Sequence, residues 1–262
     1  MSIPCKMNPL GRERLPVGYT RLAYLESIGT TRNEISYIKL DLSFNYKDRV
    51  VFETLHKIAQ NQKTNNAELR NSNNYFFWGV KSDGYEYFGF PDMTVLNTDI
   101  VAATDYAKYR LEINNLDFRF YVNENLHAEK QVKTGHEQRI GVFCALSDFG
   151  NSYPFHGKKK YFKVWIRDRI VYHLVPCLDT GGVPCMFDLT SRKPFYNEGT
   201  GEFVAGVENQ VQLNNLLSKL PDRTGQDVGT LTVRLADELQ TPENEAKLDA
   251  LRAKNWEITQ AV

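Results

Sequence analysis

The fold of this chain is decided near its N-terminus by the stretch Leu15-Pro16-Val17-Gly18-Tyr19-Thr20-Arg21-Leu22-Ala23-Tyr24-Leu25-Glu26-Ser27-Ile28-Gly29-Thr30. A second distinctive stretch runs from Val175 to Phe203. It contains Pro176-Cys177-Leu178-Asp179-Thr180-Gly181-Gly182-Val183-Pro184-Cys185-Met186-Phe187-Asp188-Leu189, and then Phe195-Tyr196-Asn197-Glu198-Gly199-Thr200-Gly201-Glu202-Phe203. We call these two stretches the opening block and the closing block. We expect them to be the two ends of one β-sandwich module.

Between the two blocks the chain carries short strand patterns that are separated by turn residues. Several of them alternate apolar with polar side chains, which is typical of antiparallel strands buried on one face. The clearest patterns span residues 50–54, 75–80, 85–90, 108–113, 117–122 and 139–144. Short hairpins are expected at Asn114-Asn115 and at Arg167-Asp168-Arg169, the latter joining strands over 161–168 and 170–175. Two packed antiparallel sheets are the economical architecture.

The opening and closing blocks resemble those of bacteriophage and prophage virion proteins with a concanavalin/laminin-G-like jelly roll. Modules of that group open near "LP-GYTRL-YLES-GTQYI" and close near "PC-D--GVPCMYDL---KFYYN-GTGEF". The resemblance covers roughly residues 12 to 206. It implies a mainly β fold: a two-sheet antiparallel jelly-roll sandwich.

The same resemblance implies a function and a location. The protein is expected to be a non-enzymatic structural protein displayed on the virion, in a tail fibre, a baseplate or on the capsid surface, and to assist attachment to the host. It would be assembled in the cytoplasm of the bacterial host. Its implied partners are other virion proteins and further copies of itself, forming a homo-oligomer.

The chain divides into three parts. Residues 1–18 are expected to form an extended N-terminal arm, residues 19–206 the jelly-roll sandwich, and residues 207–262 a small α/β tail. In the tail, leucines at helical spacing from Leu213 to Leu220 precede a strand pattern over 230–235, a helix from Thr241-Pro242 to about Lys254, and a strand over 256–259. This tail resembles the leucine-rich-repeat-like tails of phage tail-fibre and baseplate proteins.

Composition excludes several function classes. Lysine plus arginine equals aspartate plus glutamate, at 32 each, so no net field draws nucleic acid. The local basic run Lys158-Lys159-Lys160 is interpreted as a charged turn before a strand. No apolar window approaches the roughly 20 residues that span a bilayer, and no signal peptide is evident, so no membrane insertion is expected.

The chain has four cysteines, Cys5, Cys144, Cys177 and Cys185. In a reducing cytoplasm, buried free thiols that act as small apolar residues are the preferred interpretation. Cys177 and Cys185 could meet only if a hairpin placed them opposite each other. Calcium at the loop carboxylates Asp148, Asp179 and Asp188 was considered, but their spacing is not that of a dense oxygen-ligand site, and no metal or cofactor is expected.

Glycan recognition is the alternative function. Sugars stack on exposed aromatic rings and bond to polar side chains from loops. The candidate residues are Trp78, Tyr85, Tyr87, Asn73, Asn74 and Asp83. The competing interpretation is that most of these rings fill the sandwich core, because only every second residue of a strand faces outward.

A glycoside hydrolase is a weaker alternative. Jelly-roll hydrolases use two carboxylates, for which Glu53, Glu86 and Glu112 are candidates. On alternating strands, however, such residues simply mark the solvent face, and no catalytic motif is present, so no enzyme is expected. The Asn- and Gln-rich segment 57–74 is interpreted as a long loop that contacts a neighbouring subunit or a receptor.

Overall fold

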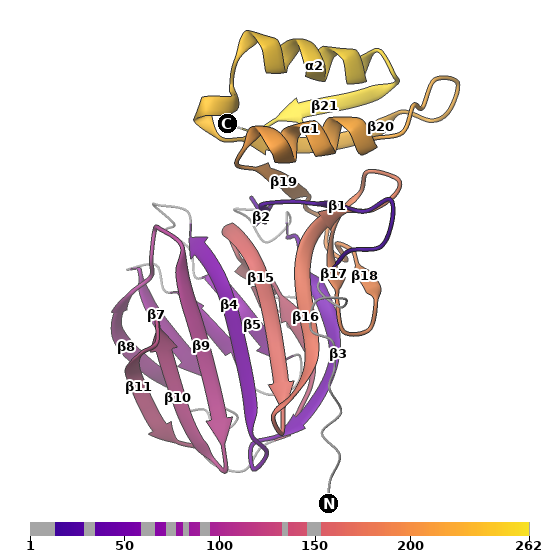
Figure 1. The fold of residues 1–262 in the computed structure, drawn as a ribbon. Helices are drawn as coiled ribbons and strands as arrows, with labels where there is room; N and C mark the ends of the chain where they lie inside the picture. Colours follow the sequence, from indigo (N-terminus) through magenta and orange to yellow (C-terminus); the bar gives the residue numbers. More distant parts are fainter. Residues whose placement is uncertain are drawn as a thin grey trace, which may run out of the picture.

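The computed structural model describes residues 14–28, 35–58, 66–71, 77–80, 84–89, 95–132, 136–145 and 153–261. This part of the chain is mainly β, as the alternating patterns predicted, and two packed sheets form a sandwich (Figure 1). None of the described helices is long and apolar enough to span a membrane.

The larger sheet has 13 strands in the described residues. Its central path follows the order β11-β10-β9-β4-β15-β2-β19-β20-β21, and β16 joins β1, β15 and β17 beside this path. The strands are β1 (Thr20–Arg21), β2 (Tyr24–Ser27), β4 (Val50–Ile58), β9 (Ala107–Asn114), β10 (Asp117–Val122), β11 (Asn125–Gln131), β15 (Gly157–Ile166), β16 (Arg169–Leu178), β17 (Pro184–Asp188), β18 (Lys193–Phe195), β19 (Phe203–Val207), β20 (Gly229–Leu235) and β21 (Trp256–Gln260).

The second sheet lies behind the first in Figure 1 and has the order β3-β12-β5-β6-β7-β8. Its strands are β3 (Ile38–Asn45), β5 (Asn66–Asn71), β6 (Phe77–Val80), β7 (Tyr85–Gly89), β8 (Val95–Val101) and β12 (His136–Val142). Two short strands, β13 (Cys144–Ala145) and β14 (Tyr153–Pro154), pair separately.

Aromatic rings from both sheets meet in the sandwich core. Phe120 and Tyr109 of the larger sheet lie 5.4 Å and 5.6 Å from Trp78 of the second sheet, measured between ring centroids. Phe88 approaches Phe120 to 4.6 Å. All four rings are fully buried. Burial of such large apolar side chains is the main force that holds the two sheets together.

The opening and closing blocks meet, as the sequence predicted. β1 of the opening block pairs with β16, where Arg21 is opposite Cys177. β2 lies between β15 and β19, and its Ser27 is opposite Phe203 at the end of the closing block. Segments about 175 residues apart are therefore hydrogen-bonded neighbours.

Three tight hairpins end neighbouring strands of the larger sheet. Asn115-Leu116, Asn123-Glu124 and Arg167-Asp168 each occupy the two central turn positions, and all six residues have positive φ between 47° and 73°. Positive φ at both positions defines the turn type whose twist suits β-hairpins. The hairpin predicted at Asn114-Asn115 is thus present but is shifted by one residue.

The C-terminal tail is an α/β unit that continues the larger sheet. β19, β20 and β21 run parallel, and α1 (Gln210–Lys219) and α2 (Pro242–Arg252) connect them. A short 3-10 helix spans Asp237–Leu239. Thr241 caps α2 by accepting a hydrogen bond from the Asn244 amide, and Pro242 occupies the first turn, as predicted.

The structure corrects two expectations. Lys158, Lys159 and Lys160 belong to β15 rather than to a turn. Lys159 is completely buried, and its ammonium group lies 4.5 Å from the ring centre of Phe155, a cation–π contact that the sequence did not reveal. The segment 57–74 is not one long loop, because residues 66–71 form β5 between β12 and β6.

Several expectations fall outside the described residues or only partly within them. Most of the predicted arm, residues 1–13, lies outside. Residues 14–18 contact the closing block: the Arg14 carbonyl accepts a hydrogen bond from Arg192.

We expect the stability of the fold to depend on Gly182, which lies where the tail packs on the closing block. A β-carbon there would lie 2.4 Å from Trp256 and 2.6 Å from Leu220, and the residue has a φ of +83°. We therefore expect Gly182→Ala to lower the free energy of unfolding by about 3 kcal/mol, through backbone strain and overpacking.

Gly225→Ala is the matched control, because Gly225 has a similar φ of +77° and nothing within 4 Å of its added β-carbon. It should cost only about 1 kcal/mol, the strain alone. Urea denaturation measures both values. Equal losses in the two variants would show that the contact with Trp256 contributes nothing.

Candidate binding groove on the outer sheet face

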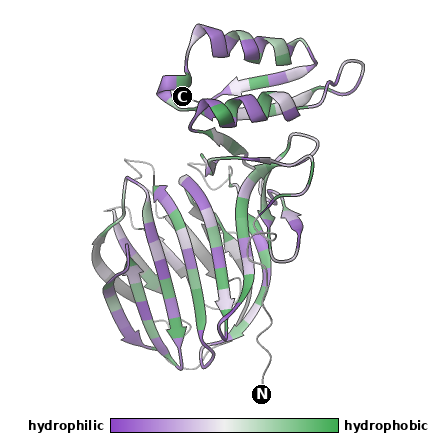
Figure 2. Cartoon of the chain, viewed as in Figure 1, coloured by the Kyte–Doolittle hydropathy of each residue, from purple (hydrophilic) through white to green (hydrophobic). Residues whose placement is uncertain are grey.

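The candidate site lies on the outer face of the larger sheet, which does not contact the second sheet. Along β9 and β15, apolar residues point into the sandwich and polar or amphipathic residues point away, with burial alternating residue by residue over much of each strand. Figure 2 shows this as alternating colours along the front strands. The outward side chains form a regular array because the strands are paired in register.

The first row of this array crosses three strands. Trp165 of β15 is opposite Val51 of β4, and Val51 is opposite Glu112 of β9. Trp165 is partly exposed, and no described ring or cation stacks on its indole. The partly exposed Trp165 ring thus presents apolar surface on the outer face of the sheet, in the same row as Glu112.

The second row places a carboxylate between two cations. Glu53 of β4 lies between Lys163 of β15 and Arg110 of β9. The Glu53 carboxylate accepts hydrogen bonds from the Tyr161 hydroxyl at 3.2 Å and lies 3.1 Å from the Lys108 ammonium group. Burial, and then the Glu53 charge, raise the pKa of Tyr161, so this hydroxyl stays a donor at all physiological pH values.

Glu112 is held in the same manner. Arg49 donates to it through Nε at 2.8 Å, and Arg110 donates at 3.2 Å. Arg49 also pairs with Asp168 in the hairpin turn between β15 and β16. Each charged side chain of the array is thus fixed by a partner, which reduces the entropy lost when a ligand binds.

These residues enclose a groove of about 320 Å³ lined by Arg49, Val51, Glu53, Arg110, Trp165 and Asp168. Its volume is at the lower end of the range of about 300–1,000 Å³ that is usual for small-molecule sites. The chemistry of the lining is an aromatic platform, two carboxylates and two guanidinium groups. The guanidinium groups can donate hydrogen bonds to the hydroxyl groups of a ligand, and the carboxylates can accept hydrogen bonds from them.

A larger cavity, of about 600 Å³, lies where the tail meets the sandwich. Its aromatic rings, Tyr24 and Tyr106, are already covered: Lys158 lies 4.6 Å from the ring centre of Tyr24, and Lys160 lies 4.2 Å from that of Tyr106. Each of these rings thus carries a cation, whereas no described cation lies over the Trp165 ring of the smaller groove.

The structure places the predicted glycan residues differently from the expectation. Trp78 is completely buried and donates its indole N–H to Glu86 at 2.7 Å, so it cannot stack on a sugar. The competing interpretation, that these rings fill the sandwich core, is therefore confirmed for Trp78. Tyr85 is 39% exposed on β7, and it stays a candidate. Tyr87 lies on the same strand, and Asn73, Asn74 and Asp83 lie outside the described residues.

The three candidate carboxylates separate into two groups. Glu53 and Glu112 point to the solvent side, as the alternation predicted, although their side chains are only 13% and 12% exposed. Glu86 was expected on the solvent face and is instead completely buried beside Trp78. Glu86 therefore cannot be one of two catalytic carboxylates on the surface.

The loop carboxylates of the closing block have structural partners. Asp188 accepts hydrogen bonds from the backbone amides of His173, Thr190 and Ser191 at 2.8–3.0 Å. Asp179 accepts from the amides of Gly181 and Val183. Asp148 lies outside the described residues, and no group of three or more metal-binding side chains occurs in the part of the chain that the structure describes.

The comparisons with known proteins support the fold alone. No protein-family model and no curated protein matches the sequence. Among solved structures, a protein of Bacteroides ovatus ATCC 8483, provisionally assigned to carbohydrate binding, matches over 68% of this chain with 13% identity and a TM-score of 0.51. The LG4-5 domains of mouse laminin alpha1 match over 58% of the chain, with 13% identity and a TM-score of 0.44.

The matches cover 59% and 46% of those two chains, respectively. The match to the Bacteroides protein and the two packed sheets described above show the expected fold, a mainly β, two-sheet jelly-roll sandwich.

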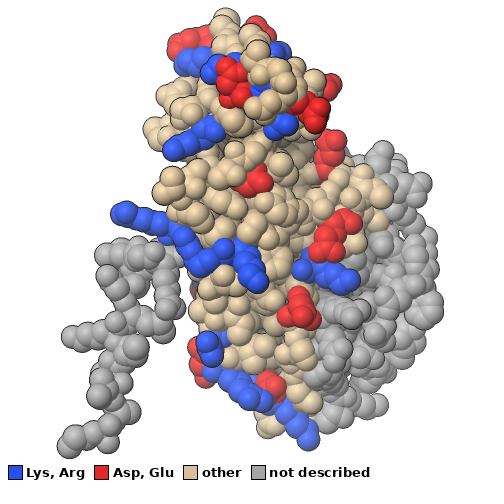
Figure 3. Space-filling model, turned by 90° about the vertical axis from the view of Figure 1, so that its right-hand side faces the viewer, with Lys and Arg blue, Asp and Glu red and all other residues tan. Residues whose placement is uncertain are grey.

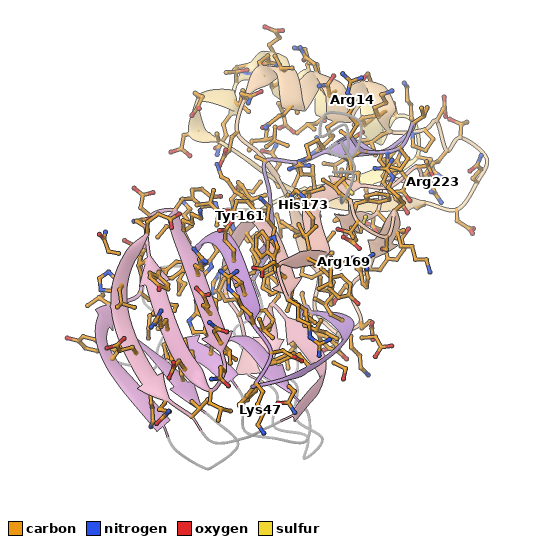
Figure 4. The ribbon with its side chains drawn as sticks, turned by 60° about the horizontal axis from the view of Figure 1, so that its bottom comes forward. Arg14, Lys47, Tyr161, Arg169, His173 and Arg223 are labelled. Atoms are coloured by element: carbon orange, nitrogen blue, oxygen red, sulfur yellow. The ribbon has the colours of Figure 1, made fainter. Side chains whose placement is uncertain are left out.

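His173 lies next to the array, on β16 opposite Lys163, and is labelled with Tyr161 in Figure 4. Burial, and then the charges of Lys163 and Arg21, lower its pKa to about 4. In the unfolded chain His173 is protonated near pH 6.5, whereas in the folded protein it is protonated only near pH 4. The free energy of unfolding therefore falls as the pH falls from about 6.5 to about 4.

We expect the free energy of unfolding to drop more between pH 7 and pH 4.5 in the wild-type protein than in His173→Gln, by about 1 kcal/mol after allowance for solvent screening. Urea titrations at several pH values measure the difference. The exposed His127 gives a control for loss of a histidine, His127→Gln. If the stability of the wild type and of His173→Gln depended on pH in the same way, the lowered pKa of His173 would be contradicted.

Proposed function

We propose that this protein is a non-enzymatic glycan-binding module whose sugar site is the groove at Trp165. The observation that carries the proposal is the partly exposed Trp165 ring, which lines one groove with Glu53, Arg49 and Arg110. Ion pairs with Lys108 and Glu112 hold these three charged groups in place. Stacking supplies affinity, and paired polar groups supply orientation.

The charge pattern fits a neutral ligand better than a polyanion. Figure 3, which views the molecule at a right angle to Figure 1 and not onto the groove, shows Lys and Arg side chains among Asp and Glu side chains on that side. The groove is lined by two carboxylates, those of Glu53 and Asp168, and two guanidinium groups, those of Arg49 and Arg110, so the lining carries little net charge. A neutral sugar loses little hydration energy there, whereas a polyanion would meet Glu53 and Asp168.

The test is a glycan-array screen of the full chain, followed by affinity measurements on variants. Trp165→Ala should weaken binding about 10- to 100-fold, the loss expected for one stacked aromatic ring. Trp165→Phe should recover part of the affinity. Thermal melts of both variants show whether the fold is intact.

Tyr85→Ala is the matched control for Trp165→Ala, because it also removes a partly exposed ring, but from the second sheet. It should leave binding unchanged. If Tyr85→Ala abolishes binding and Trp165→Ala does not, the site lies at β7 as the sequence alone suggested. An array without any bound glycan would oppose the proposed function itself.

We infer as a second candidate that the sandwich is a structural subunit on a bacteriophage particle, where a glycan of the host surface would be its ligand. The support is the sequence resemblance together with the pairing of the two blocks that carry it, β1 with β16 and β2 with β19. A protein of this kind would assemble with copies of itself and with other virion proteins.

Light scattering on the purified protein tests the assembly. We expect a defined multiple of the 30.2 kDa chain mass. A monomer at every concentration up to tens of micromolar would contradict self-assembly and would leave the glycan proposal intact.

A further inference from the structure

Cys177 and Cys185 are a closely placed pair of buried thiols in the described residues. Cys177 lies on β16 and Cys185 lies directly opposite on β17. Their Sγ atoms are 3.5 Å apart, and both residues are completely buried as free thiols. The hairpin that the sequence required for them to meet is therefore present.

The backbone already has the geometry of a disulfide. Directly opposed residues of an antiparallel pair have Cα atoms about 4.5 or 5.5 Å apart, depending on the hydrogen-bond pattern. A disulfide spans Cα separations of about 4.4–6.8 Å. The sulfur atoms need only approach from 3.5 Å to roughly 2.05 Å, which small side-chain rotations supply.

The pair lies in a small apolar cluster that is separate from the sandwich core. Val175, Phe187 and Leu189 complete the cluster, and Leu15 and Tyr19 of the N-terminal segment pack over it. The Tyr19 ring lies 5.0 Å from that of Phe187. The hydrogen bond with the Cys177 thiol, and then burial, raise the pKa of Cys185, so few thiolates are present to react while the pair is buried.

We propose that Cys177 and Cys185 form a disulfide when the protein meets a low-molecular-weight disulfide such as oxidised glutathione. One cysteine thiolate attacks the glutathione disulfide and releases one glutathione thiolate. The second cysteine thiolate then attacks the protein sulfur of the mixed disulfide and releases the second. Two electrons pass from the cysteine pair to glutathione, and the two thiol protons end on the two glutathione molecules.

The bond would join two adjacent strands of the closing block. β16 also pairs with β1 of the opening block and with β15. The disulfide would therefore fix the hairpin that holds the N-terminal segment against the sheet, in the state that an oxidising compartment provides.

The experiment compares the full chain before and after incubation with oxidised glutathione. Digestion under non-reducing conditions and mass spectrometry should show the peptides of Cys177 and Cys185 joined, with the loss of two hydrogens. The oxidised protein should melt about 5 °C higher, and dithiothreitol should reverse the shift. Peptide mapping separates this bond from any reaction of Cys5 or Cys144.

Two variants make the result specific. Tyr19→Ala should speed formation of the bond several-fold, because it removes the ring that packs over Phe187 beside the pair. Cys185→Ala should leave only a mixed disulfide of glutathione at Cys177. The proposal fails if the Cys177–Cys185 bond is absent both after native oxidation and after refolding from denaturant in a glutathione redox buffer.

Discussion

The antiparallel pairing of β2 with β19 is the interaction on which the rest of the structure depends. β2 is only four residues long, and all four are buried between β15 and β19. It closes the larger sheet between the sandwich strands and the tail. Without it, the first residues of β15, Gly157 to Lys159, would have an open edge, and β19 would have no partner on its sandwich side. The pairing joins segments about 175 residues apart, so it carries a cost in loop-closure entropy.

An ion pair accompanies this pairing. Glu26 of β2 is 3% exposed, and its carboxylate lies 2.7 Å from the guanidinium of Arg234 on β20. The two residues are not on adjacent strands, because β19 runs between them. Their bond crosses the middle strand and ties the sandwich to the tail. A buried pair of this kind adds little net stability, but an alternative register of β19 would leave an unpaired buried charge, which is costly.

The fold was largely predictable from the sequence because half-buried strands alternate visibly, as at Tyr109, Leu111 and Ile113. The site was not. Trp78 and Glu86 lie on β6 and β7, and which face of these strands points inward depends on pairing with distant strands. Trp165 was overlooked because Val164-Trp165-Ile166 is a continuous apolar run. The signal was present in the alternation of Tyr161, Lys163 and Trp165 with the buried Phe162 and Val164.

The double role of β19 also limits how such a protein can evolve by exchange of parts. Residue 207 looks in the sequence like a boundary at which a different tail could be joined. In the structure β19 pairs with β2 on one side and with β20 on the other, while Trp256 of the tail packs against Gly182 of the closing block. A recombination event at that point would separate surfaces that fit only each other. Exchange that preserves folding has to keep the opening block, the closing block and the tail together, and vary the strands and turns at the far end of the sandwich instead.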